Sequence, residues 1–142
     1  MRKINYIVVH CTATKEGQDF KAKDIDRWHK ERGWSKIGYH YVIDLDGTIE
    51  KGRKEEEIGS HVAGHNKDSI GIVYVGGLDS KGNPKDTRTE AQKEALWKIL
   101  TELLCKYPTA NILGHRDFKG VSKACPCFDA KKEYSVINLK EK

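Results

Sequence analysis

INYIVVH, residues 4–10, is a short run dominated by β-branched residues. Such side chains pack well on the pleated surface of a sheet, so the run predicts a buried strand. The strand ends at His10, which places an imidazole where the chain leaves the sheet. The polar segment CTATKEGQDF follows and is predicted to be a loop.

A second strand with a terminal histidine is predicted at ANILGH, residues 110–115. In α/β sheets, functional side chains gather at strand ends and in the loops beyond them. His10 and His115 therefore converge if their two strands lie close together and parallel. Cys125 follows ten residues after His115, in the stretch VSKACPCFDA. We expect these three side chains to share one end of the sheet.

The other periodic segments predict two helices, a hairpin and one more strand. A helix is expected over Lys21–Arg32, and a longer helix begins at the capping box Thr89–Gln92. Asp46–Gly47 suits a tight turn between two strands in GYHYVIDLDGTIEKG. A strand is predicted over about Ser69–Val75, followed by the long loop GLDSKGNPKDTR.

These elements predict one α/β domain spanning residues 1–142. Its centre is expected to be a mixed β-sheet of about five strands flanked by helices, with the functional cleft at one edge of the sheet. The tail, residues 130–142, shows weak periodicity and is predicted to be a short helix or a frayed end.

Composition limits the class of partner. The chain has 142 residues, of which 33% are charged, and a formal net charge of +5, which favours an anionic partner. The lysines are scattered rather than clustered, so no nucleic acid is expected. No apolar run approaches the roughly 18 residues of a membrane helix, so no membrane insertion is expected. A monomer is the default.

The N-terminus, MRKINYIVVH, lacks the apolar region and cleavage site of a signal peptide. We therefore expect synthesis in the cytoplasm, with release or export by another route. Without an export signal, the four cysteines are expected to be reduced thiols. Cys125 and Cys127 are also a poor disulfide pair, because one intervening residue would close a strained ring.

Two imidazoles and one thiolate suit Zn²⁺, and three protein ligands leave a fourth position open, as in catalytic zinc sites. His10, His115 and Cys125 are thus candidate ligands. Two alternatives stay open from spacing alone. The histidines could simply meet backbone carbonyls, or Cys127 could close a structural site as a fourth ligand.

The sequence also predicts where four further side chains lie. His29 lies on a charged helical stretch and is predicted to face solvent. His40 is expected in the core or the hairpin, and Cys11 in the core behind His10, because neighbouring strand residues face opposite sides. Cys105 is predicted to continue the apolar side of the long helix.

Six motifs occur in a characteristic order from about Tyr6 to Asp129: VVHCTAT, RWHKERGW, GYHYVIDLDGTIEKGR, GSHVAGHNKDSIGIVYVGG, GHRDF and KACPCFD. Together they resemble the zinc-dependent N-acetylmuramoyl-L-alanine amidases. More closely, the chain is similar to the phage lysozyme-type amidases, in the family that also contains the peptidoglycan recognition proteins. The resemblance covers residues 6–129 and leaves the tail, residues 130–142, outside it.

The resemblance implies a role for each residue of a candidate site. His10, His115 and Cys125 would hold one Zn²⁺ ion in a cleft at one edge of the sheet. Tyr39 in GYH and Lys123 in SKACP fall where the family has its catalytic tyrosine and lysine. His61 and Asn66 lie in a segment that lines the substrate groove in the family, so both are expected to contact substrate. From residue type alone, Tyr39 would be a packing residue and Lys123 a solvated one.

The implied function is hydrolysis of the amide between N-acetylmuramic acid and L-alanine in peptidoglycan. One rival is a non-catalytic peptidoglycan-binding module, but such relatives lack the zinc thiolate. A second is a recycling amidase acting on anhydro-muropeptides, whose third ligand is a carboxylate. A structural zinc protein that binds nucleic acid would need a fourth ligand, for which Cys127 is the nearby candidate.

Overall fold

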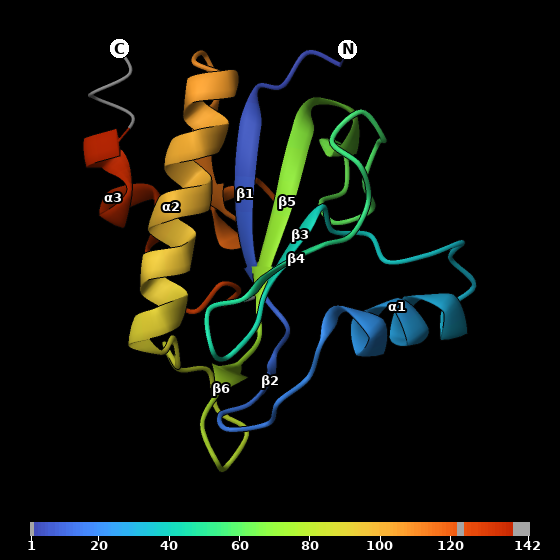
Figure 1. Ribbon diagram of the computed structural model, residues 1–142, viewed down its shortest axis with the longest axis vertical. Coiled ribbons are helices and arrows are strands. Elements are labelled where there is room, and N and C mark those ends of the chain that lie inside the picture. Colours follow the sequence, from blue (N-terminus) through green and yellow to red (C-terminus); the bar gives the residue numbers. More distant parts are fainter. Residues whose placement is uncertain (1, 122–123, 138–142) are drawn as a thin grey trace.

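A five-stranded mixed sheet forms the centre of the molecule in the computed structural model, which describes residues 2–121 and 124–137 (Figure 1). The strand order is β4-β3-β5-β1-β7. β1 pairs in parallel with β5 and with β7, β3 pairs in parallel with β5, and β4 is antiparallel to β3. The strands are β1 (Tyr6–Cys11), β3 (Tyr41–Ile43), β4 (Ile49–Lys51), β5 (Ser69–Tyr74) and β7 (Asn111–Gly114). The predicted α/β fold is confirmed.

Helices cover both faces of this sheet (Figure 1). α2 (Glu90–Lys106) and α3 (Ala130–Glu133) pack on one face, and α1 (Ala22–Glu31) lies on the other. The described residues also contain two short 3-10 helices, η1 (Asn66–Asp68) and η2 (His115–Asp117). Among the described residues, no helix is both long enough and apolar enough to cross a membrane.

The side chains of β1 alternate between the two faces. Ile7, Val9 and Cys11 belong to the large core beneath α2, whereas Val8 belongs to a separate cluster on the opposite face. Since successive strand residues point to opposite sides, His10 projects from the face that α2 does not cover. The prediction that Cys11 lies in the core is confirmed, with 5% of the residue exposed.

A second, two-stranded sheet occurs where the sequence predicted only loops. β2 (Thr14–Lys15) pairs in parallel with β6 (Gly77–Leu78). The loop prediction was wrong here because a two-residue strand is too short to show alternation. The pairing depends on a glycine, since a Cβ at Gly77 would lie 2.6 Å from the sulfur of Cys11.

The position predicted for Cys105 was wrong. The buried residues of α2 end with Leu103 and Leu104, and Cys105 is exposed. Each helical residue turns about 100° from the one before it, so Cys105 leaves the buried face one step beyond Leu104.

One buried glutamine fastens α2 to the sheet. The Gln92 side chain donates through Nε2 to the carbonyls of Val75 (3.0 Å) and Ile43 (3.3 Å). Its Oε1 accepts from the backbone N–H of Thr89 (2.9 Å), which completes the predicted capping box. Gln92 is fully buried, so it satisfies backbone groups that water does not reach.

Replacing Gln92 with leucine is expected to lower the free energy of unfolding by about 2–4 kcal/mol, because buried backbone groups would lose their partners. Urea denaturation of the Gln92→Leu variant would measure the loss. Glu94→Leu, at an exposed position of the same helix, is the matched control and should change stability little. Equal effects from the two variants would contradict the anchoring role.

Candidate metal centre

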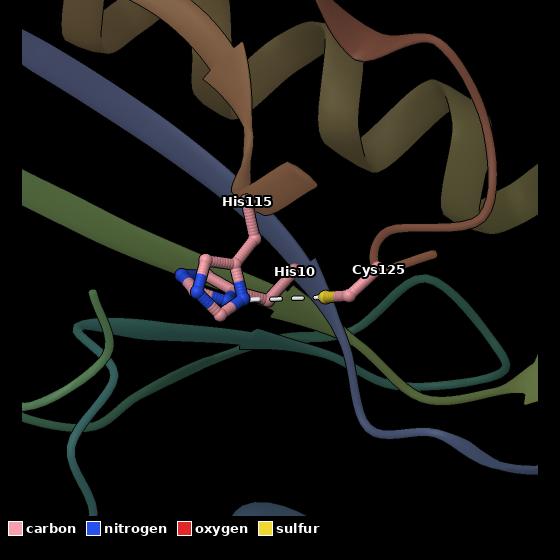
Figure 2. Close-up of side chains that lie close together, drawn as sticks. All are labelled: His10, His115 and Cys125. Carbon is pink, nitrogen blue, oxygen red and sulfur yellow. Dashed lines mark hydrogen bonds between the residues drawn. The ribbon is translucent and has the colours of Figure 1, made fainter. Parts of the chain in front are cut away.

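His10, His115 and Cys125 point toward one another from three segments of the chain (Figure 2). His10 lies at the end of β1, and His115 directly follows β7. Val9 lies opposite Gly114 in the parallel pairing of these strands, so the residue after each is a histidine. Cys125 comes from the loop beyond η2. One ligand atom from each residue falls within a group whose members lie within 4.8 Å of one another.

The geometry and chemistry of this group fit Zn²⁺. Tetrahedral zinc, with bonds of about 2.0–2.3 Å, holds its ligand atoms roughly 3.3–3.8 Å apart. His10 Nδ1 lies 4.0 Å from the sulfur of Cys125. A small inward movement of these two side chains would therefore bring both atoms to the spacing that zinc requires. Burial, reinforced by His61 and His115, lowers the pKa of His10 well below its ordinary value, which leaves a neutral imidazole able to bind metal.

The Cys125 sulfur also meets a backbone donor. The N–H of Cys11 donates to it at 3.2 Å, an interaction that favours a thiolate over a thiol. A thiolate is the form of cysteine that binds metal. The group therefore offers two imidazoles and one sulfur with an amide dipole directed at it.

Cys127 stands apart from this group. Its sulfur lies 3.8 Å from that of Cys11 and packs against the large core. Burial raises the pKa of Cys127 to about 12, and a hydrogen bond to Cys125 together with burial raises that of Cys11. Both are therefore thiols at neutral pH. Within the described part of the chain, the group that could hold a metal contains Cys125 and not Cys127.

An open cleft of about 480 Å³ adjoins the three candidate ligands. One wall comes from the end of α1 and the turn after it, and the other from the loop between β4 and β5. Its lining beyond the three ligand candidates consists of Cys11, Thr12, Ala13, His29, Arg32, Trp34, Tyr39, Ser60, His61, Val62, Ala63 and Asn66.

Tyr39 lies just before β3, between two histidine rings. Its ring centroid is 5.0 Å from that of His10 and 5.5 Å from that of His29. Burial raises the pKa of Tyr39, so the phenol keeps its proton at neutral pH. Tyr39 can therefore donate a hydrogen bond into the cleft. Its catalytic role stays a prediction.

His61 and Asn66 both line the cleft, and their roles toward substrate stay predictions. Asn66 has a clear local function. Its Oδ1 accepts from the backbone N–H groups of His61 (2.8 Å) and Val62 (2.9 Å), which fixes the turn that carries His61. Lys123 lies outside the described residues.

His29 was predicted to face solvent, and that prediction was wrong. It is buried, and its Nδ1 accepts from the backbone N–H of Gly38 at 2.9 Å. The available signal was its spacing from Ile25, since residues four apart share a helix face and Ile25 is also buried. His40 is buried as expected, and its Nδ1 accepts from the N–H of Gly71.

Arg32 and Trp34 were also not singled out as residues of the cleft. Both line it, and the guanidinium of Arg32 lies 5.9 Å from the centroid of the Trp34 ring. They belong to the motif RWHKERGW, which marks the segment but does not show which of its side chains turn inward.

Comparisons with known proteins show which family the chain is similar to. The sequence pattern of the N-acetylmuramoyl-L-alanine amidase family matches residues 1–128. The endolysin of Klebsiella phage KP32 is 46% identical over 138 residues, covering 97% of this chain and 90% of that one. The endolysin of Escherichia phage T7 is 46% identical over 133 residues, with 94% and 87% covered.

A solved structure shows the same arrangement of elements. The N-acetylmuramoyl-L-alanine amidase LysC from Clostridium intestinale superposes with a TM-score of 0.79 at 33% identity. The match covers 98% of this chain and 85% of that one. Both sequence and fold are therefore similar to those of amidases along almost the whole length of the chain.

The environment of His29 predicts acid sensitivity. Burial lowers the pKa of His29 to about 4 from an ordinary value near 6.5. The unfolded chain then binds more protons than the folded chain between these values. Stability from this group is complete above pH 6.5 and is lost as the pH falls toward 4.

We expect the destabilisation caused by His29→Asn to shrink by about 2 kcal/mol between pH 7 and pH 4. Chemical denaturation of the zinc-free protein at several pH values would measure it. Using the difference between variant and wild type cancels the titration of other histidines. A penalty that is the same at both pH values would show that His29 is not the group responsible.

Proposed function

The chain belongs to the N-acetylmuramoyl-L-alanine amidase family, and from this premise we propose how its cleft performs the reaction. The reaction is hydrolysis of the amide between N-acetylmuramic acid and L-alanine in peptidoglycan, which opens the bacterial cell wall. The observation that supports the proposal best is the convergence of His10, His115 and Cys125 beside an open cleft.

His10, His115 and Cys125 would hold one Zn²⁺ ion. Bound zinc would acidify a water molecule and polarise the scissile carbonyl. Since three protein ligands leave tetrahedral zinc one open position, the site is suited to catalysis rather than to a structural role. The neutral state of His10 and the amide directed at Cys125 keep both side chains ready to bind metal.

Tyr39 and Lys123 are the proposed catalytic side chains. The protonated phenol of Tyr39 would orient the attacking water or pass a proton to the leaving amine. Lys123 stands two residues before Cys125 in the sequence. Its ammonium group would steady the negative charge that develops on the carbonyl oxygen.

The cleft would hold the muramyl peptide. Asn66 Oδ1 is engaged with the backbone, so we propose that its amide nitrogen contacts substrate. His61 would contribute the carbon edge of its ring, because both of its nitrogens have partners within the protein. All these residues come from one domain, residues 1–142, and the proposed working unit is a monomer acting at the cell wall.

The rival functions fit less well. A non-catalytic binding module does not require a sulfur in a metal-binding group, and a recycling amidase would carry a carboxylate where Cys125 stands. A closed structural site would need Cys127, which lies outside the group formed by the described residues.

The Cys125→Ser variant is expected to lose both zinc binding and the release of stem peptides from purified peptidoglycan, because the thiolate ligand is lost. Cys127→Ser is the matched control and should keep both. Metal analysis of each purified variant, alongside a stem-peptide assay, gives the answer. Loss of zinc in both variants would instead indicate four protein ligands.

The Tyr39→Phe and Lys123→Ala variants are each expected to lower kcat by about 10²–10⁴-fold while zinc content stays at the wild-type level. Tyr41→Phe is the matched tyrosine control, because the Tyr41 hydroxyl donates to Glu55 and the residue does not line the cleft. A Tyr39→Phe enzyme as active as Tyr41→Phe would rule out the proposed role.

A further inference from the structure

A chain of hydrogen bonds joins the candidate ligand His10 to a backbone carbonyl. His10 Nε2 lies 2.9 Å from His61 Nδ1. On the other side of that ring, His61 Nε2 lies 3.1 Å from the hydroxyl of Ser69, which in turn lies 2.7 Å from the carbonyl oxygen of His65. Ser69 is fully buried, so its hydroxyl depends on these protein partners.

The carbonyl of His65 at the end of this series fixes which partner donates in each of its hydrogen bonds. A carbonyl oxygen can only accept, so the single hydroxyl proton of Ser69 must point to His65. If that proton pointed to His61 instead, two oxygens 2.7 Å apart would face each other with no proton between them. The Ser69 oxygen is thus left to accept, and the proton of the next bond belongs to His61 Nε2.

The same reasoning carries on to His10. In a pair of neutral imidazoles, each ring carries one proton and one bare nitrogen. With that proton on Nε2, His61 has a bare Nδ1 that accepts from His10 Nε2. His10 therefore has a bare Nδ1, and this is the nitrogen that lies 4.0 Å from the Cys125 sulfur.

We propose that His61 and Ser69 are positioning residues that hold His10 in the tautomer whose Nδ1 lone pair faces the metal position. This inference rests on the proposed zinc site. Histidine ligands generally need a partner for the second ring nitrogen, and that partner sets the tautomer, the ring orientation and the basicity of the ligand. Here the partner is a second imidazole.

The fold provides a fitted place for the His61 ring. A Cβ at Gly71 would lie 2.7 Å from Cγ of the ring, and a Cβ at Gly59 would lie 2.8 Å from its Cδ2. Gly71 lies between Ile70 and Ile72 in β5, so the ring rests directly on the sheet beside β1. On the backbone side, Asn66 holds the N–H of His61. Packing and hydrogen bonds therefore both hold the His61 ring in the same position.

Zinc affinity tests the role of His61. Competition with a chromophoric chelator should show zinc binding weakened about 10–100-fold in His61→Leu, the usual cost of losing such a partner. His61→Asn should restore affinity to within about threefold of wild type, because its Oδ1 can take the place of the accepting Nδ1. His65→Leu, a histidine replaced in the same loop, should bind zinc as wild type does.

The tautomers can be read without any metal. Nitrogen-15 NMR of the zinc-free wild-type protein should show protons on Nε2 of both His10 and His61. Protons on Nδ1 of both rings would mean that donors and acceptors are exchanged in this series of hydrogen bonds, and that result would overturn the proposal. This measurement decides the question even if His61→Leu fails to fold.

The outcomes also separate this inference from the proposed function. If wild type binds zinc and His61→Leu binds it equally well, the positioning role is wrong while the amidase site stands. If wild type binds no zinc, the proposed metal site is wrong, and the tautomers seen by NMR still show whether Ser69 and His61 orient His10.

Discussion

The parallel register between β1 and β7 is the constraint on which the candidate metal centre depends. With Val9 opposite Gly114, the next residues of the two adjacent segments are His10 and His115. A slip of one residue would turn every side chain of β1 to the other face and carry His10 into the core beneath α2. The same alternation places Cys11 in that core, where Cys125 and Cys127 pack against it. One strand therefore supplies both a candidate ligand and part of the core that supports the loop carrying Cys125.

The two faces of the sheet are built differently. The face toward α2 is filled with aliphatic side chains from several strands and from the helix, which makes it dense and difficult to rearrange. The opposite face carries a smaller cluster around Val8, together with the imidazole rings and glycines near the cleft. The loop over this face is tied down by Arg2, whose guanidinium donates to the carbonyls of Glu55, Asn66, Lys67 and Ser69. Hydrogen bonds, rather than apolar packing, hold this loop in place.

The sequence predicted those parts of the fold that repeat regularly. β1 and β5 are short runs rich in β-branched residues, and α2 follows helical periodicity, so their positions came close to the observed bounds. His10, His115 and Cys125 could be grouped because two strands end alike and a cysteine follows. The local surroundings of His61 could not be predicted, because they depend on a loop without periodicity that folds back onto Gly71. His29 was misjudged because its charged neighbours on the helix outweighed its spacing from Ile25.

Gly71 has a consequence for anyone who would engineer this protein. A glycine in the middle of a buried strand is an obvious target for stabilisation, since a side chain there would ordinarily add strand propensity and buried surface. At this position the space is already taken by the ring of His61, and even a methyl group would collide with it. Libraries that seek heat tolerance should therefore leave position 71 unchanged and search the face beneath α2, where stability and chemistry do not compete for the same volume.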